Sequence, residues 1–311
     1  MTEINKLIEA DETNSQESLK LFDQFDPSLV TSFDDAANLL TVFSRSFGHG
    51  ATDDDTQHSM AKLAEEEGLT EPEIKQALSG RRPSSMRNDL FEKIVSNRND
   101  YYSRRSRGLL LLQTYRSYMY SATDIRRLRA GTAIGLMRLE IEAVALMSLF
   151  QVNTELAFNW FNLKGDRQGK VFYNKTKKDV SEFCDRFELT AEWNLASSAS
   201  QHSRFIGLVD GLSISSSSNL DRYTNIFSLA LQDFDPEKPE QLIVRALYIL
   251  RTQAKLLLPL QLALPEVSDP LLLETRIPKF IKNIGMIYDK FEKKFPEFIE
   301  SIGIEPKETD A

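Results

Sequence analysis

Apolar residues recur at intervals of three and four positions through long stretches of the chain, the spacing of helices that bury one face. The residues around them are mostly Leu, Ala, Glu, Lys and Arg, which favour helices. Only 13 Gly and 11 Pro interrupt a chain of 311 residues, so few turns are obligatory. The pattern predicts an all-α fold.

The most apolar stretch spans residues 125–161 and is apolar around most of a helix circumference. Such a helix is typical of the centre of a bundle. Arg138, Glu140 and Glu142 interrupt it. Because an uncompensated buried ion is costly, we expect these charges to have partners. The i,i+4 spacing of Arg138 and Glu142 predicts an ion pair.

Helices and one polar connection are expected after this stretch. Residues 165–179 are polar and bear several lysines, which predicts a connection with room for a short hairpin. Further helices are expected at 178–186, at 190–208, from 221, at 239–260 and at 270–295. The last three begin near a proline or aspartate that suits a helix start.

Before the apolar stretch, residues 59–82 have the spacing of two short helices joined by a turn. Gly68 offers the left-handed conformation that ends the first helix. Thr70 and Glu73 form a capping box for the second, and Gly80 closes it.

This segment resembles the Cro/CI-type (XRE-like) helix-turn-helix family, through Leu63-Ala64, Gly68-Leu69-Thr70, Ile74, Gly80 and Arg81-Arg82-Pro83. The resemblance implies that helices near 35–47 and 84–95 complete a small bundle. It also implies that helix 71–79 enters the major groove. The implied contacts to bases or phosphates are Lys75, Gln76 and Ser79, and the implied contacts to phosphates are Arg81, Arg82 and Arg87.

Charge is distributed unevenly along the chain. The net charge is −8, yet residues 81–131 hold twelve basic residues against four acidic ones, so the remainder carries −16. Residues 51–73 hold eight acidic residues against Lys62, which repels phosphate unless that surface faces away. The basic stretch has two interpretations. It either continues the DNA-facing surface, with Arg104, Arg105 and Arg107 on phosphates, or packs against the acidic remainder.

Tyrosines lie among these arginines, at positions 101, 102, 115, 118 and 120. Interleaved Arg and Tyr suit stacking on the bases of single-stranded nucleic acid or RNA. Their spacing is equally typical of half-buried packing on a helix.

The chain has few residues for catalysis, with His49, His58 and His202 as its histidines and Cys184 as its one cysteine. The aspartates from Asp53 lack the glycine and glutamate of a calcium-binding loop. We therefore expect no enzymatic activity, no cofactor and no metal.

A single cysteine excludes an intramolecular disulfide, which favours a reducing compartment. The sequence begins without a signal-like pattern and contains no uncharged apolar run long enough to span a bilayer. These features predict a cytoplasmic protein that does not contact membranes.

Together the patterns predict an acidic segment at 1–32, a helix-turn-helix-like domain at 33–96, a helical bundle at 97–302 and a tail at 303–311. The predicted function is that of a DNA-binding regulator whose bundle serves dimerisation or docking of a protein partner. A homodimer is expected because single helix-turn-helix units usually pair two half-sites. The alternative is a helical interaction or scaffold protein that binds proteins and no nucleic acid.

Overall fold

A computed structural model describes residues 27–50, 62, 67–127, 130–197 and 239–294. Within these residues the structure is helical and contains no strand, which confirms the predicted all-α fold. None of the helices in this described part is long and apolar enough to cross a membrane.

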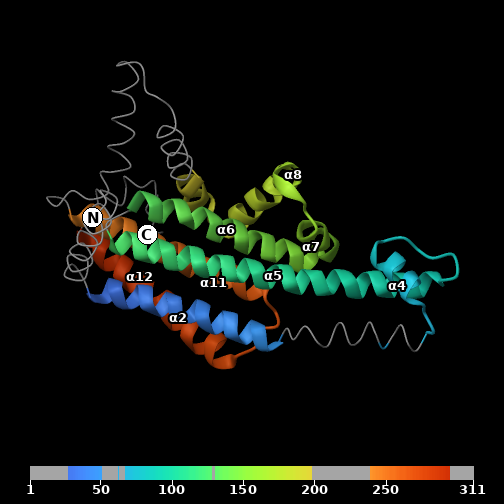
Figure 1. Cartoon of the computed structure of the whole chain (residues 1–311). Coiled ribbons are helices and arrows are strands. Elements are labelled where there is room, and N and C mark those ends of the chain that lie inside the picture. Colours follow the sequence, from blue (N-terminus) through green and yellow to red (C-terminus); the bar gives the residue numbers. More distant parts are fainter. Residues whose placement is uncertain (1–26, 51–61, 63–66, 128–129, 198–238, 295–311) are drawn as a thin grey trace, which may run out of the picture.

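The main bundle is built from five long helices (Figure 1). They are α2 (Pro27–Gly50), α5 (Asn88–Arg126), α6 (Ala130–Val152), α11 (Pro239–Ala263) and α12 (Ile277–Lys294). Shorter elements are α4 (Glu71–Leu78), α7 (Thr154–Phe161) and the π-helical turn η1 (Leu271–Arg276), and α8 (Gly165–Arg186) lies against α6. The predicted helices at 239–260 and 270–295 are thereby confirmed as α11 and as η1 followed by α12.

The antiparallel pair of α5 and α6 forms the centre of the bundle. The apolar stretch at 125–161, expected as a helix, is divided among the end of α5, α6 and α7. The break between α6 and α7 lies at Asn153. Its side chain accepts a hydrogen bond from the Leu156 backbone N–H (3.0 Å) and thereby starts a new helix. A local polar cap therefore overrides an apolar pattern that is compatible with one long helix.

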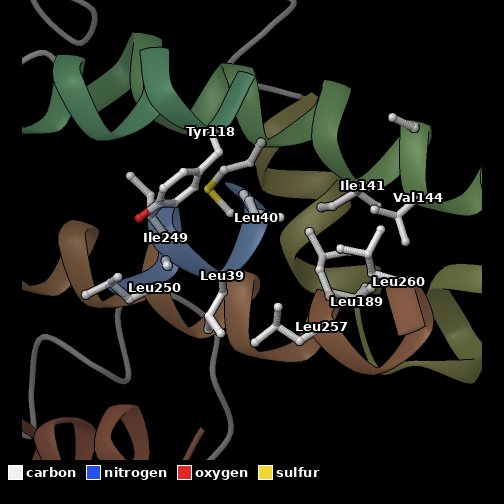
Figure 2. Packing of buried hydrophobic residues seen from close by; sticks show 14 of the residues in the cluster. Leu39, Leu40, Tyr118, Ile141, Val144, Leu189, Ile249, Leu250, Leu257 and Leu260 are labelled. Atoms are coloured by element: carbon white, nitrogen blue, oxygen red, sulfur yellow. The ribbon is translucent and has the colours of Figure 1, made fainter. Parts of the chain in front are cut away.

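The core lies where α2, α6 and α11 meet α5 (Figure 2). Leu40 of α2, Ile141 of α6 and Leu250 of α11 are among its fully buried side chains. Each such side chain stabilises the fold by about 1.5–3 kcal/mol. Tyr118 of α5 is buried among them, and its hydroxyl donates to the Phe33 carbonyl of α2 (2.8 Å).

Helix α2 belongs to this core and does not pack with α4. Phe33, Phe43 and Phe47 lie in the main hydrophobic cluster, whereas the buried residues of α4 belong to a separate one. The expectation that a helix at 35–47 completes a small bundle around helix 71–79 is therefore wrong. The large apolar residues of α2 find a larger apolar surface on α5, α11 and α12.

The expected polar connection at 165–179 is also wrong, because these residues form the first four turns of α8. Gly165, the first residue of α8, takes the left-handed conformation (φ 75°). Downstream, Val180, Phe183 and Cys184 are buried, so one apolar face anchors a helix that is otherwise polar. Burial raises the pKa of the Cys184 thiol to about 12, as befits a small buried hydrophobe. The described residues 190–197 are helical, and the segment from 221 lies outside the described residues.

Charged groups within the bundle have partners, as predicted for Arg138 and Glu142. The Arg138 Nε donates to Glu142 Oε1 (2.7 Å), and the Tyr173 hydroxyl of α8 accepts from the same guanidinium (2.7 Å). Glu140 is buried in the core, where it accepts a hydrogen bond from the Gln253 amide of α11. Desolvation raises the pKa of Glu140 to about 8.

Glu140 makes stability depend on pH. Its pKa is raised above the unfolded value, so its protonated form stabilises the fold at low pH and this contribution is lost as pH rises through about 8. We expect the free energy of unfolding to fall by roughly 4 kcal/mol between pH 5 and pH 9. Glu140→Gln should remove most of that slope in urea denaturation, whereas Glu182→Gln on the exposed face of α8 should keep it. An unchanged slope in Glu140→Gln would contradict this assignment.

Candidate functional site

The helix α4 and the first turns of α5 form a small unit beyond the end of the bundle, which we call the head (residues 67–98; Figure 1). Its hydrophobic cluster consists of the buried residues Ala77, Met86, Leu90 and Ile94, with Leu69, Leu78 and Phe91 packed against them. This cluster is separate from the main core. The head is therefore attached to the bundle through the continuous helix α5, and the boundary expected near residue 96 falls inside that helix.

The predicted capping box fixes the start of α4. The Glu73 carboxylate accepts from the backbone N–H (2.9 Å) and the hydroxyl (2.6 Å) of Thr70, and also from the Ser85 hydroxyl. Hydrogen bonds from Ser85 and from Thr70 lower the pKa of Glu73 to about 2. Gly68 (φ 65°) takes the left-handed conformation that the sequence predicted for it, and Gly80 (φ 82°), two residues after the end of α4, takes it as well. The first helix of the resembled motif, residues 59–67, lies almost entirely outside the described residues.

Arg98 fastens the other end of α4 to the rest of the molecule. Its guanidinium donates to the Leu78 carbonyl at the end of α4 (2.8 Å) and to the neighbouring Asn99 side chain (2.8 and 3.1 Å). It also lies 3.8 Å from the ring centroid of Phe158 in α7. Arg98 is 6% exposed, so these contacts hold a buried charge. One side chain thus connects α4, α5 and α7 and sets the orientation of the head.

The six residues that the sequence predicted as contacts on this segment are all exposed on the head: Lys75, Gln76, Ser79, Arg81, Arg82 and Arg87. Lys75 pairs with Glu71 (2.6 Å), and Arg87 lies near Asp89 (3.2 Å) and Glu67 (3.8 Å). The Ser79 hydroxyl donates to the Gln76 backbone carbonyl (2.7 Å), and Arg82 donates to Asn88 (3.3 Å). Residues 67–98 hold five acidic and six basic residues, one of which is the buried Arg98, so the head carries a formal net charge of only +1.

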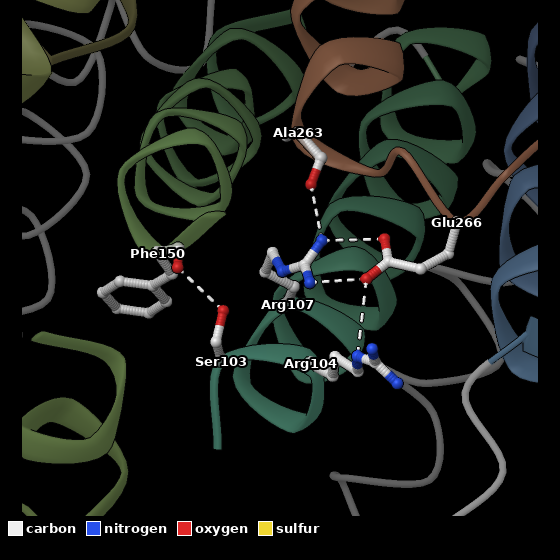
Figure 3. Close-up of polar contacts among 6 residues, drawn as sticks. All are labelled: Ser103, Arg104, Arg107, Phe150, Ala263 and Glu266. Carbon is white, nitrogen blue, oxygen red and sulfur yellow. Dashed lines mark hydrogen bonds and ion pairs between the residues drawn. The ribbon is translucent and has the colours of Figure 1, made fainter. Parts of the chain in front are cut away.

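The remaining predicted residues, Arg104, Arg105 and Arg107, lie further along α5 and do not form one surface (Figure 3). Arg107 is buried, and its guanidinium binds both oxygens of Glu266 (2.6 and 2.8 Å) and the Ala263 carbonyl (2.9 Å). Arg104 is half-exposed and 4.0 Å from the same carboxylate. Arg105 is exposed and donates to the Tyr101 hydroxyl (2.7 Å). Arg107 is therefore unable to reach a phosphate in this structure.

No protein-family model matches the chain, and no curated protein or solved structure matches it either. The case for a function therefore rests on the geometry of the head and of α5.

Sequence reasoning missed the role of Arg98 and of Glu266. Arg98 follows Leu90 and Ile94 at intervals of four, so the helical spacing of the buried stripe could have placed it inside. Glu266 offered no such signal, because it lies in the turn between α11 and η1, more than 150 residues from Arg107.

Replacing Arg98 should loosen the head and leave the bundle intact. Arg98→Ala removes the donor to Leu78 and leaves a part-buried carbonyl unpaired, which should destabilise α4 by about 1–2 kcal/mol. We expect faster amide hydrogen exchange in α4 and unchanged exchange in α6, with Arg105→Ala as the exposed control on the same helix. Protection of α4 equal to that of the unmodified chain would refute the role given to Arg98.

Arg107 and Glu266 should behave as a coupled buried pair. Arg107→Met leaves the Glu266 carboxylate without its partner and should lower the free energy of unfolding by about 3 kcal/mol. The double variant Arg107→Met/Glu266→Leu should recover most of that loss, because both charges are then gone. Arg104→Ala, whose charge is half-exposed, should cost less than about 1 kcal/mol. Additive effects of the two single substitutions in denaturation curves would be inconsistent with the pairing.

Proposed function

We propose that this chain is a helical protein-interaction module whose head is a contact surface for a protein partner. The observation that carries the proposal is the position of the head: it lies beyond the bundle at the end of one continuous helix, and it exposes charges of both signs, five basic and four acidic residues. The mode of action is binding, without covalent chemistry.

The near-neutral charge of the head, +1 over residues 67–98, favours protein over nucleic acid as its partner. Affinity for nucleic acid depends on a surplus of Lys and Arg that displaces counterions from phosphates. On the head, carboxylates of the same segment already engage Lys75 and Arg87. A mixture of exposed charges of both signs instead supports recognition of a protein surface with the complementary arrangement.

The internal contacts of the head also support a binding role. Arg98 fixes the end of α4, and the Glu73 carboxylate fixes its beginning to Ser85. A surface held in place before binding loses less conformational entropy when a partner docks. The head therefore presents its exposed side chains from a prearranged backbone.

DNA binding is the second candidate, and one observation favours it. Gln76, Arg81 and Arg82 are exposed near the same end of α4, where two guanidinium groups and an amide suit contacts to phosphates and base edges. In this alternative the chain is a DNA-binding regulator, and pairing of two copies on adjacent half-sites is expected.

A photo-crosslinking amino acid in place of Gln76 tests the proposal. In an extract of the source cells we expect it to crosslink one protein, and Arg81→Glu/Arg82→Glu in the same chain should abolish that crosslink by reversing two charges at the contact. The matched control carries the crosslinker in place of Lys178, an exposed residue of α8 far along the chain, and should not yield the same product.

The competing outcome is measured with labelled duplex DNA, single-stranded DNA and RNA at two salt concentrations. Binding that weakens steeply with salt and disappears in Arg81→Ala/Arg82→Ala would overturn the proposal in favour of the second candidate.

A further inference from the structure

The C-terminal half of α5 exposes a row of apolar residues and arginines that we call the outer face. It consists of Arg105, Leu109, Leu112, Arg116, Met119 and Tyr120, all of them exposed. Leu109 is 47% exposed, Leu112 41%, Met119 37% and Tyr120 64%. From Arg105 to Met119 the intervals are four, three, four and three, which is the spacing of a seam that packs against one other helix.

The distribution of side chains around α5 makes this row unusual. The side of α5 that faces the bundle carries several polar residues, with Ser106, Thr114, Ser117 and Ser121 buried. Leucine, methionine and tyrosine meanwhile face outward on the same turns. Several large apolar side chains exposed along one face of a helix, away from the core, are characteristic of an interaction site.

The same row is already covered by a helix at its N-terminal end. Extended toward the head, the seam includes Tyr102 and Arg98, and α7 lies on both. Phe158 contacts Tyr102 (ring centroids 5.1 Å apart) and the Arg98 guanidinium, and Phe161 lies 5.4 Å from the Arg105 guanidinium. The structure thus shows how a helix with aromatic side chains occupies this seam. Beyond α7 the seam continues through Leu109 and Leu112.

We propose that the outer face binds an amphipathic helix of an acidic partner protein, which continues the line that α7 begins. Apolar residues of the partner helix would cover Leu109, Leu112 and Met119. Its carboxylates would pair with Arg116 and lie near Arg105, because none of the six positions of the outer face is acidic. The inference deepens the proposed protein-interaction function and uses a surface separate from the head.

A second copy of this chain is a poorer occupant of the outer face. Two outer faces in contact would bring two Arg116 side chains into one seam whose six positions on each copy include no acidic residue. Like charges opposed across a helix seam are destabilising, whereas an acidic helix places carboxylates opposite Arg116. Charge therefore distinguishes the two occupants.

The test uses the full chain and two synthetic helical peptides with leucine at the seam positions, one with glutamate and one with lysine at the flanking positions. By fluorescence anisotropy we expect the chain to bind the glutamate peptide and to bind the lysine peptide at least ~10-fold more weakly, a difference of about 1.4 kcal/mol. Arg116→Glu should reverse this preference. Leu258→Ser/Leu262→Ser, which alters two leucines of α11 that are somewhat more exposed than Leu109 and Leu112, should change neither affinity.

Circular dichroism of each variant verifies that it is folded. Absence of binding to both peptides, equal binding of both, or a preference that Arg116→Glu leaves unchanged would each overturn the inference. It would also be overturned if analytical ultracentrifugation found a dimer that Arg116→Glu strengthens or Leu112→Ser abolishes, because a second copy would then occupy the face. None of these outcomes depends on Gln76 or Arg81, so this test and the test of the head can fail independently of each other.

Discussion

Buried backbone carbonyls need donors, and in this protein side chains of α5 supply them to the helices around it. Arg98 donates to the last carbonyl of α4, Arg107 to the last carbonyl of α11, and Ser103 to the Phe150 carbonyl near the end of α6. Helix ends leave carbonyl groups without intrahelical partners, and an unpaired buried carbonyl destabilises a fold by about 1–3 kcal/mol. The assembly of the bundle therefore depends on polar residues of its central helix.

This requirement explains why α5 has polar residues inside and apolar residues outside. A helix that must reach neighbouring carbonyls cannot present only hydrocarbon to them, so its buried stripe includes serines, arginines and Tyr118. Hydrophobic burial between α2, α6 and α11 then provides most of the apolar core. Leu109, Leu112 and Met119 remain on the opposite side, where a partner can cover them. The apolar outer face of α5 is thus linked to the way in which the bundle is held together.

Sequence reasoning succeeded where the hydrophobic pattern and local capping decide the structure. The all-α class, α11, the capping box of α4 and the Arg138–Glu142 pair were predictable from spacing alone. It failed where contacts between residues far apart in the sequence determine the structure. The packing of α2 on the main core depends on apolar surfaces distant in sequence, and the polar start of α8 becomes helical because its C-terminal half is anchored. The candidate residues on the head are exposed, as binding residues must be. Arg107 is buried because it binds Glu266, and no pattern in the sequence links Glu266 to Arg107.

The fate of the basic stretch shows why charge in a sequence differs from charge on a surface. Residues 81–131 carry a large positive excess, yet Arg98 and Arg107 are buried and Arg104 shares the Glu266 carboxylate. The exposed guanidinium groups include those of Arg81 and Arg82 on the head and that of Arg116 on the outer face. The start of α5 and Arg116 are separated by 28 residues, or about 40 Å of helix. One small partner cannot contact both surfaces at that separation, so the interaction proposed for the head and the one proposed for the outer face are separable.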